Sequence, residues 1–459
     1  MPTPILPPPG EGLRKGPLHM TEQPAALGGS PAVTIDQAHY SQWPIYTEEE
    51  AQVAADLIRN HALSSAQDGP GPITELEKRV ADTWGVQHAI AHSSGTTALR
   101  TALFGVGVVP GDEVITQSAV HPFNCLPIIG CGAVPIFADI DPLTTTLDPA
   151  DVERKITSRT RAIMVVHWKG IPADMDAIMD IARRHGLKVV EDNAVSQGTT
   201  HRGRMLGTIG DASAISFQDG KLTSAGEGGV FMTDSDEVFQ RAATLGHYER
   251  LKELPDPKWR AVSGFSFGEK YRMATITAAI GVVQMKHWRN RLDVRHDNAA
   301  KLGRAIAEID GFSVPDYPDY FPSPYQSGRI VFHPDRLGGL TRERLIDVLN
   351  AEGAVVKSPA RRDSRIPHTD GLWRMLHKHP VFTGNEHGTE DILWEVLGPN
   401  ATKIDYKSVV LPVTEDPEVP YDTIELPSFT RPADDLIDQY AKAFDKVATH
   451  AHRLTATRA

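Results

Sequence analysis

Apolar and polar residues alternate along the first two thirds of the chain in a pattern that predicts strands and helices in turn. Short apolar runs of the strand type occur at residues 89–91, 114–115, 134–138, 162–166, 187–190, 212–217 and 229–233. Such alternation is typical of an α/β fold, in which a mainly parallel sheet is covered by helices on both faces. Ligands of such sheets bind at the carboxyl ends of the strands.

Helical patterns precede and separate these strands. Residues 48–60 are predicted to form one helix. A second places Ile73, Leu76, Val80 and Trp84 on one face, and Gly85 ends it. Further helices are predicted from about residue 98, at 123–131 and at 174–186.

The pattern changes after residue 288. A helix at 289–309, weak strands at 329–333 and 355–356, a helix at 342–352 and an amphipathic last helix around residues 436–447 predict a smaller α+β domain, with residues 357–400 irregular. We therefore expect three parts. They are a disordered leader at residues 1–30, native or added to the natural protein, a large domain at 31–287 and a small C-terminal domain at 288–459.

Composition narrows the class of protein. With 459 residues, 40% of them hydrophobic and 23% charged, the chain is long enough for a large core and two domains. A net charge of −12 argues against nucleic acid or an anionic membrane as the main partner. The sequence contains no apolar run of membrane-spanning length and no signal peptide, so we expect a cytoplasmic protein. Its two cysteines, Cys125 and Cys131, have neither metal-site nor disulfide spacing.

One lysine lies in an unusual setting. An apolar strand at 215–217 leads to Lys221, and a Gly-Glu-Gly-Gly turn follows at 226–229, so an amine lies beside backbone suited to close approach. Asp192 ends a buried-type strand 29 positions earlier (221 − 192), where a carboxylate is costly unless it meets a positive partner. A protonated pyridine nitrogen is such a partner, and a lysine that forms a Schiff base is the other requirement of pyridoxal 5′-phosphate (PLP). Although most single lysines are solvated loop residues, this combination predicts PLP chemistry at Lys221.

Ser94, Gly95 and Thr96 lie between a predicted strand and a predicted helix. Backbone N–H groups at a helix start, together with the helix dipole, suit a phosphate. By themselves these residues are better explained as an ordinary helix N-cap. Together with Lys221 and Asp192, they favour a phosphate site.

The stretch around Lys221 resembles the sugar and cyclitol aminotransferases of the DegT/StrS type, which are fold-type I PLP enzymes. The resemblance is carried by Ser-Phe-Gln-x-x-Lys at 216–221 and Gly-Glu-Gly-Gly at 226–229, and it extends from about Leu27 to the C-terminus. Gln218 is closest to the scyllo-inosose aminotransferase and aminohydroxybenzoate synthase branch, because nucleotide-sugar members more often have histidine there. The resemblance implies a fold-type I PLP-dependent transferase whose large domain binds PLP.

The resemblance assigns further residues to the cofactor. It implies that the 94–96 loop and the Ser216 hydroxyl bind the PLP phosphate. His121 stands where the family usually has an aromatic ring stacked on the cofactor, and a flat imidazole can take that role. The alternative for His121 is a histidine in a surface turn before Pro122.

Val195 departs from the family pattern. Family members commonly have glutamine or histidine three residues after the aspartate, where it hydrogen-bonds near the ring oxygen of the cofactor. Valine cannot do so, and we expect Asn193, Ser196 or a water molecule in its place.

The segment 268–273, Gly-Glu-Lys-Tyr-Arg-Met, resembles the family segment Gly-x-Asn-Tyr-Arg-Met, with Lys270 in place of asparagine. In the family this position reaches the phosphate bound by the neighbouring subunit, and a lysine would do so with full charge. The resemblance therefore implies a homodimer whose active sites are shared between two chains. For Tyr271 and Arg272, an ordinary interface pair is an equally good explanation.

Histidines and arginines gather in the irregular stretch after residue 357. The spacing of the histidines matches no ordinary zinc pattern, and we expect no metal. An active-site wall or contacts with an acidic substrate group are the alternatives, but the sequence does not single out the arginine that binds the donor carboxylate. The residues are Arg361, Arg362, Arg365, His368, His377, His379 and His387.

These residues predict an enzyme that moves an amino group onto a cyclic ketone. Lys221 would bind PLP and act as general base and acid, while Asp192 keeps the ring nitrogen protonated. Family resemblance implies L-glutamine or L-glutamate as donor and a cyclitol or keto-sugar as acceptor, in the biosynthesis of a specialised metabolite such as an antibiotic. The alternative is a PLP-dependent lyase or dehydratase like aminohydroxybenzoate synthase. A PLP-binding regulator without turnover is disfavoured, because both Lys221 and Asp192 are present and no basic DNA-binding segment is found.

Overall fold

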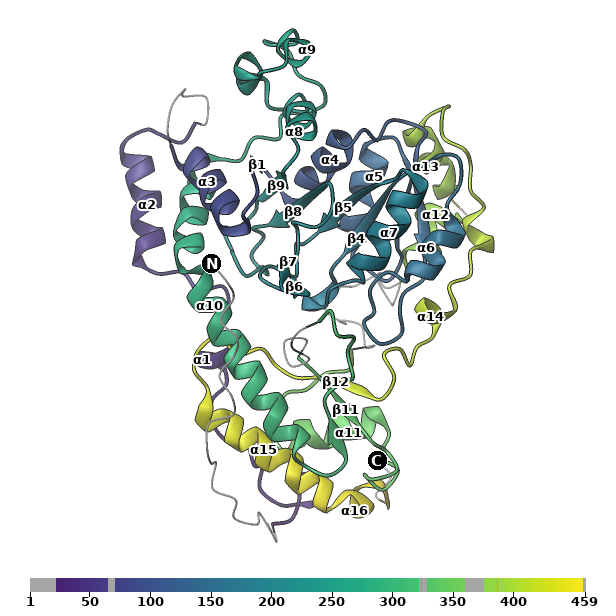
Figure 1. Cartoon of the computed structure of the whole chain (residues 1–459). Helices are drawn as coiled ribbons and strands as arrows, with labels where there is room; N and C mark the ends of the chain where they lie inside the picture. Colours follow the sequence, from purple (N-terminus) through teal and green to yellow (C-terminus); the bar gives the residue numbers. More distant parts are fainter. Residues whose placement is uncertain are drawn as a thin grey trace. The chain divides into compact units, whose positions relative to one another are not determined.

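The computed structural model describes residues 22–64, 71–321, 323, 328–359, 375–385 and 387–456. Their contacts separate into two units (Figure 1). The sheet unit comprises Trp43–Asp293 and Arg362–Pro420, and the small unit comprises Met1–Gln42, Val294–Arg361 and Tyr421–Ala459. The break at 293 lies close to the boundary expected at 287/288. The units differ from the predicted domains in two places, because residues 31–42 group with the small unit and residues 375–420 with the sheet unit.

A seven-stranded sheet, in the order β1-β9-β8-β5-β4-β2-β3, forms the centre of the sheet unit. Five neighbouring strands, from β8 to β3, run parallel, whereas β9 is antiparallel to both β8 and β1. This arrangement confirms the predicted α/β fold with a mainly parallel sheet. The strands are β1 His88–His92, β2 Glu113–Gln117, β3 Val134–Ala138, β4 Thr160–Val166, β5 Lys188–Asp192, β8 Ala212–Ser216 and β9 Gly229–Thr233, with a separate hairpin of β6 Thr200–His201 and β7 Arg204–Met205.

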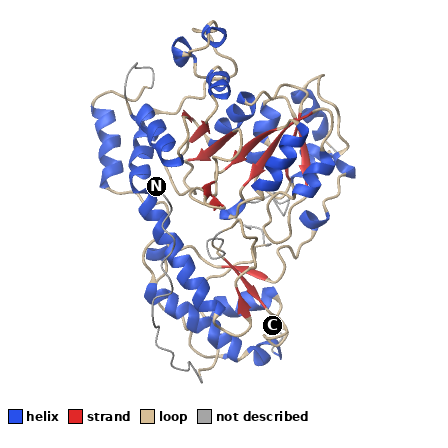
Figure 2. Ribbon diagram, in the orientation of Figure 1, coloured by secondary structure: helices blue, strands red, loops and turns tan. Residues whose placement is uncertain are grey.

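Helices cover both faces of the sheet (Figure 2). Successive side chains of a strand point to opposite faces. In β4, accordingly, Ala162 and Met164 enter one core with α4 Gly95–Gly105, α5 Leu126–Gly130 and α8 Asp236–Ala243. Ile163 and Val165 enter the opposite core with α6 Pro149–Lys155 and α7 Met175–His185. A third core joins β1, β8 and β9 to α3 Pro72–Trp84 and the first part of α10 Thr275–Ala307.

Several predicted helix ends agree with the structure. Gly85 ends α3 with φ 74°, and Asp174 caps α7, which Gly186 ends. Two predictions were wrong. The helix expected at 289–309 begins earlier, at Thr275, and the helix expected at 123–131 is divided into η2 Pro122–Asn124 and α5, because Pro127 lacks the N–H group that a continuous helix would need there. The remaining helices of this unit are α2 Glu48–Arg59, η3 Trp168–Gly170, η4 Tyr248–Glu253 and α9 Pro257–Arg260.

Residues 375–420 cover the edge strand β3. Phe137 of β3 packs with Phe382 and Tyr406, whose hydroxyl donates to the Pro135 carbonyl at 2.8 Å. The Asp139 carboxylate accepts from the N–H groups of Val413 and Thr414. These contacts explain why the segment groups with the sheet unit. Within residues 357–400, where an irregular stretch was expected, the segment contains η7 Leu376–Lys378, α12 Pro380–Thr383 and α13 Thr389–Leu397. Beyond that stretch it contains η8 Tyr406–Ser408 and α14 Pro412–Glu415.

The small unit is built on a three-stranded antiparallel sheet in the order β10-β11-β12. The expected strand at 355–356 is absent, and only Lys357 forms a bridge, with Glu425 of β12. The elements are η1 Ala25–Leu27, α1 Ala38–Ser41, β10 Phe312–Ser313, β11 Arg329–Phe332, α11 Arg342–Ala351, β12 Thr423–Glu425, α15 Asp434–Thr449 and α16 Ala451–Ala456.

A buried ion pair attaches residues 25–33 to the small unit. Glu352 and Lys446 are almost fully buried, with Nζ 3.0 Å from Oε2. The Glu352 carboxylate also accepts from the N–H groups of Ala25 and Ala32, and Lys446 donates to the Ser30 carbonyl. This pair therefore gives the segment before the sheet unit a fixed place.

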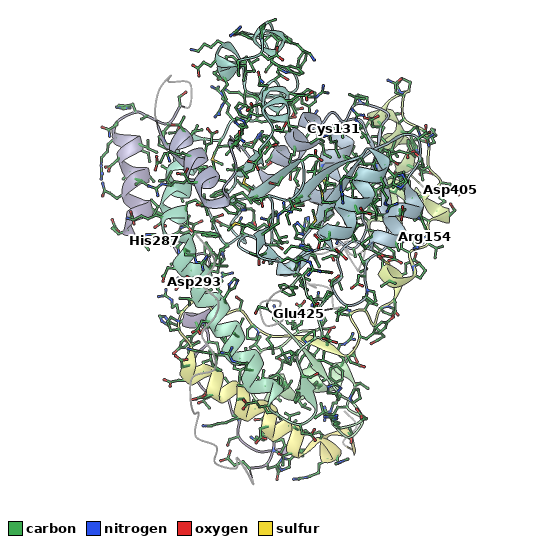
Figure 3. The ribbon with its side chains drawn as sticks, in the orientation of Figure 1. Cys131, Arg154, His287, Asp293, Asp405 and Glu425 are labelled. Carbon is green, nitrogen blue, oxygen red and sulfur yellow. The ribbon has the colours of Figure 1, made fainter. Side chains whose placement is uncertain are left out.

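Both cysteines are free thiols, and Cys131, which lies at the end of α5, is labelled in Figure 3. In the part of the chain that the structure describes, no helix combines the length and apolar character needed to cross a bilayer.

Candidate active site

The predicted site residues lie where three strands end. Asp192 is the last residue of β5 and Ser216 the last residue of β8, which is the parallel neighbour of β5. Because β9 runs antiparallel between β8 and β1, its first residue, Gly229, pairs with both Ser216 and His92. The 94–96 loop, which follows β1, therefore reaches the same edge of the sheet.

The backbone is tightly packed where Gly229 meets Gly95 and where Gly95 meets Ser216. A Cβ atom on Gly229 would lie 2.6 Å from the N and Cα atoms of Gly95, and one on Gly95 would lie 3.0 Å from the Ser216 Cβ. Position 229 thus requires glycine, and position 95 has little room for a side chain. The close packing brings the Ser216 hydroxyl next to the first turn of α4.

The 94–96 loop is both a helix cap and a donor site. The Ser94 hydroxyl accepts from the Thr97 N–H at 3.1 Å, as the N-cap interpretation expected. The N–H groups of Gly95 and Thr96 open the helix and have no acceptor within the described residues. Free N–H groups at a helix start, beside the Ser216 hydroxyl, form a donor set that fits a phosphate.

Lys221 lies in a turn that fixes its backbone. Its N–H donates to the Gln218 carbonyl at 2.8 Å, and its own carbonyl accepts from Trp43 Nε1 at 3.1 Å. Its half-buried amine has no hydrogen bond or ion pair among the described residues. Burial lowers the pKa of Lys221, against the opposing charges of Asp192 and Glu227. The amine is therefore more readily neutral, and nucleophilic, than that of an ordinary lysine.

Asp192 is buried and only partly compensated. Burial raises its pKa, while the Ala194 N–H, which donates to Oδ1 at 3.0 Å, and the Lys221 charge act in the opposite direction. The Asn124 amide lies 3.5 Å from Oδ2. A buried carboxylate without a full countercharge fits the protonated ring nitrogen of PLP. This carboxylate, the free Lys221 amine and the phosphate donor set together match the three polar ends of the cofactor.

Sequence reasoning missed several residues that surround this site. Thr116 donates to the Asn124 amide oxygen at 2.8 Å and so orients Asn124 toward Asp192. Buried Gln197 donates to the Ser216 carbonyl at 2.8 Å. Tyr46 donates to Asp219, two residues before Lys221, at 2.7 Å. No local pattern indicated these residues, because the contacts of Asn124 with Asp192 and of Tyr46 with Asp219 join distant parts of the chain.

His121 lies in the loop between β2 and η2. Its Nδ1 accepts from the Phe123 N–H at 3.4 Å, and the two ring centroids are 4.5 Å apart. Burial and the Lys221 charge lower the pKa of His121, so its ring feels the charge of the Lys221 amine. Its stacking on the cofactor stays a prediction.

The residues expected to replace the missing glutamine or histidine at position 195 are already engaged in part. The Ser196 hydroxyl donates to the His167 carbonyl and accepts from the Gly170 N–H. Asn193 donates to the Leu206 carbonyl at 2.8 Å, and its Oδ1 is buried without a partner among the described residues. Of the two, only Asn193 retains a free polar atom.

Glu191, next to Asp192, is fully buried with four donors. Its Oε1 accepts from the N–H groups of Ile209 and Gly210, both at 2.7 Å, and its Oε2 from Gly207 N–H at 2.8 Å and His167 Nε2 at 3.0 Å. Burial alone would raise the pKa of Glu191, but these hydrogen bonds outweigh burial and lower it. Glu191 thus fixes the 207–210 turn to the end of β5.

Lys270 lies in a segment that passes the phosphate donor set. The Tyr271 carbonyl accepts from Ser93 N–H at 2.8 Å, the Tyr271 hydroxyl bonds to Arg100, and Arg272 pairs with Glu249. The Lys270 side chain is exposed and has no ion-pair partner within the described parts of the chain.

The described histidines after residue 357 have separate roles. His377 is fully buried and contacts Ser118, and His379 caps α12. Among the described residues no group of three or more histidine, cysteine or acidic side chains is placed to bind a metal ion. Arg361, Arg362, Arg365 and His368 lie outside the described residues.

Comparison with known proteins identifies the family. Residues 44–411 match the model of the DegT/DnrJ/EryC1/StrS aminotransferase family. The chain belongs to this family. An L-glutamine:2-deoxy-scyllo-inosose aminotransferase from Streptoalloteichus tenebrarius is 32% identical over 356 residues, which cover 75% of this chain and 83% of that protein.

Two further proteins support the assignment. The GDP-perosamine synthase of Caulobacter vibrioides is 38% identical over 296 residues, covering 61% of this chain and 74% of that protein. The X-ray structure of an aminotransferase from Psychrobacter cryohalolentis has a TM-score of 0.72 at 25% identity, covering 90% of this chain and all of that one. The predicted family, its fold-type I architecture and PLP as cofactor are thus confirmed for this DegT/DnrJ/EryC1/StrS aminotransferase.

Proposed function

We propose that this DegT/DnrJ/EryC1/StrS aminotransferase moves an amino group from L-glutamine or L-glutamate to a cyclic ketone, either a cyclitol or a keto-sugar. The observation that carries the proposal is the half-buried Lys221 amine, which has no hydrogen bond or ion pair among the described residues and whose pKa is affected by the charge of Asp192 at the end of β5. The relatives that act on L-glutamine and an inosose, or that make GDP-perosamine, support the substrate classes. A role in specialised metabolism such as antibiotic biosynthesis, and a cytoplasmic location, stay predictions.

Lys221 has two proposed roles, and each of the other residues below has one. Lys221 binds PLP covalently, Asp192 pairs with its ring nitrogen, and His121 stacks on its ring. The Gly95 and Thr96 N–H groups and the hydroxyls of Ser94 and Ser216 bind its phosphate. When bound, PLP supplies an electron sink for the carbanion formed at the donor Cα. Once the amine of the donor has displaced it from PLP, the Lys221 Nζ, whose pKa is lowered by burial, would accept the proton from that Cα and later donate it.

The spectrum of the purified protein tests this function. Wild type with PLP is expected to absorb on the order of 410–430 nm, and L-glutamine or L-glutamate should shift the band to about 330 nm. Lys221→Ala should lack the first band. A band that no amino donor shifts would favour the lyase or dehydratase, the alternative indicated by Gln218. Absence of any band with added PLP would refute the assignment of the site.

We further propose a homodimer in which Lys270 reaches the phosphate bound by the partner. Exposed Lys270 has no ion-pair partner among the described residues of its own chain. The same unit exposes the neighbouring rings of Phe265 (67%) and Phe267 (45%), whose centroids are 6.2 Å apart, and exposed apolar patches are typical of protein interfaces.

Mixing two defective variants tests the shared site. Lys221→Ala and Lys270→Ala are each expected to be impaired. A mixed dimer would contain one site with both lysines intact, so mixing should restore activity. A mixture no more active than the Lys270→Ala protein alone, with exchange of subunits verified, would contradict shared sites.

A further inference from the structure

The loop that carries His121 is attached at both ends. It leaves β2 at Ser118 and reaches η2, whose last residue is Asn124. At the far end, Asn124 contacts the Asp192 carboxylate and accepts from Thr116. At the near end, the partner of Ser118 is His377, 259 positions away in the sequence. Two anchors therefore place His121 and Asn124. The contacts of Asn124 are made with strands of the sheet, whereas Ser118 is bound by His377, which lies outside the sheet.

The second anchor is a buried hydrogen-bond chain. Ser118 and His377 are both fully buried, and the Ser118 Oγ lies 2.6 Å from His377 Nδ1. The His377 backbone N–H donates to the same Oγ at 3.1 Å, so the hydroxyl proton is available for Nδ1. The His377 Nε2 lies 3.0 Å from Glu415 Oε1. Burial lowers the pKa of His377, and the neutral ring then has its proton on Nε2, which donates to Glu415.

The elements behind His377 are themselves fixed to the sheet. Glu415 also accepts from the Leu411 N–H at 2.8 Å, and the carboxylate of Asp139, directly after β3, accepts from the Thr414 N–H of the same helix, α14. Leu376 is buried in the same apolar cluster as Val120 and Cys125 of the His121 loop. The 375–415 segment is thus held against the sheet by its own contacts. The hydrogen bond between His377 and Ser118 then fixes the loop relative to this segment.

We propose that His377 is a positioning residue of the active site. Through Ser118 it fixes the 118–124 loop, and with it the places of His121 and Asn124 relative to Lys221 and Asp192. The inference rests on the proposed function, because it takes the cofactor to occupy the face that these residues border. His377 itself touches neither substrate nor cofactor.

Two substitutions separate the bonds of the imidazole. In His377→Asn, the side-chain oxygen replaces Nδ1 and accepts from Ser118, but the side chain is too short for Glu415. In His377→Gln, the longer amide reaches Glu415, but nothing replaces Nδ1 as the acceptor for Ser118. His379→Asn is the matched control, because the His379 Nδ1 caps Val381 N–H at 3.2 Å and asparagine also caps helices.

The measurement is PLP binding to the apo form of the full chain, followed by absorbance and by the visible circular dichroism of the bound cofactor. His377→Gln is expected to raise the PLP Kd about three- to tenfold, the effect of one lost buried hydrogen bond, and to change the dichroic band. His377→Asn and His379→Asn should stay within about twofold of wild type. The melting temperature should decrease similarly in both His377 variants, since each variant loses one hydrogen bond of the Ser118–His377–Glu415 chain.

Equal PLP affinity in the asparagine and glutamine variants would overturn the proposal, because a merely structural histidine predicts that result. If neither His377 variant folds, Ser118→Ala replaces them. It should weaken PLP binding as the glutamine variant does, and unchanged affinity would again overturn the proposal. Failure of the wild type to bind PLP would instead refute the proposed function.

Discussion

Glu191 gives the sharpest test of how the site is built. Glu191→Gln replaces a fully buried carboxylate, which accepts from four donors, with an amide of nearly the same shape. One amide oxygen can still accept from the N–H groups of Ile209 and Gly210. The amide nitrogen, however, would face the Gly207 N–H and His167 Nε2, both of which donate in the wild type.

The expected cost follows from these contacts. His167 cannot relieve the conflict by moving its proton to Nδ1, because Nδ1 accepts from the Ala173 N–H at 3.3 Å. Two buried donors therefore lose their acceptor, and each costs about 1–3 kcal/mol. We expect Glu191→Gln to lower the free energy of unfolding by about 3 kcal/mol.

Denaturant unfolding followed by tryptophan fluorescence measures this loss. Trp84 reports on the affected region, because its Nε1 donates to the Leu206 carbonyl, beside the 207–210 turn. Exposed Glu153, which pairs with Arg184, provides the control Glu153→Gln, which should change little. A loss below about 1 kcal/mol for Glu191→Gln would refute the reasoning.

The same carboxylate predicts a pH dependence. Its folded pKa lies below the ordinary value of 4.5, so its stabilisation is fully present above that value and is lost as pH falls through the lower folded pKa. The stability difference between wild type and Glu191→Gln should therefore be constant near neutral pH and shrink below about pH 4.5. A difference that grows on acidification would contradict the lowered pKa.

Three further changes test other parts of the molecule. Asp192→Asn removes the buried countercharge and should slow the half-reaction with L-glutamine on the order of 100-fold in stopped-flow absorbance; an unaffected rate would exclude Asp192 as ring partner. Gly229→Ala places a Cβ 2.6 Å from Gly95, and this overlap should destabilise the fold by about 1–3 kcal/mol. A PLP titration should show weaker binding; wild-type affinity would contradict the close packing of the phosphate donor set. Lys446→Met leaves the Glu352 charge buried and should cost about 3–5 kcal/mol in urea unfolding; Glu352→Gln in the same chain should recover part of it.

The strands and the chemistry at their ends could be predicted from the sequence because both are local signals. Asp192 and Lys221 are recognisable by what precedes and follows each of them, and the helix stop at Gly85 by a single residue type. The start of α10 was missed for a physical reason. Residues 275–288 are mostly small or apolar and include Gly281, where a Cβ would lie 3.1 Å from Leu76, so close packing replaces the usual helical pattern.

The contacts that orient the site residues could not be predicted. Ser118 and His377 are 259 positions apart, and nothing in either local sequence indicates the other. The bond between Trp43 and the Lys221 carbonyl is another example, with 178 positions between the two residues. Such pairs can be predicted only when the order of the strands in the sheet is known, since they depend on which strand ends are neighbours.

The bridge between Lys357 and Glu425 has a consequence for engineering. Each of the two residues donates its N–H to the other's carbonyl, at 3.0 and 2.8 Å, so the long excursion between them is closed at its base like the stem of a hairpin. Because the entropy of closing a loop grows only with the logarithm of its length, the stem tolerates a replaced excursion of different length, provided that the graft keeps Thr423 and Ile424, which belong to β12 of the small sheet. Such a graft would replace the support behind the His121 loop and leave Lys221 and Asp192 in place. The stem is therefore a natural cutting point for chimaeras that exchange the support behind the His121 loop.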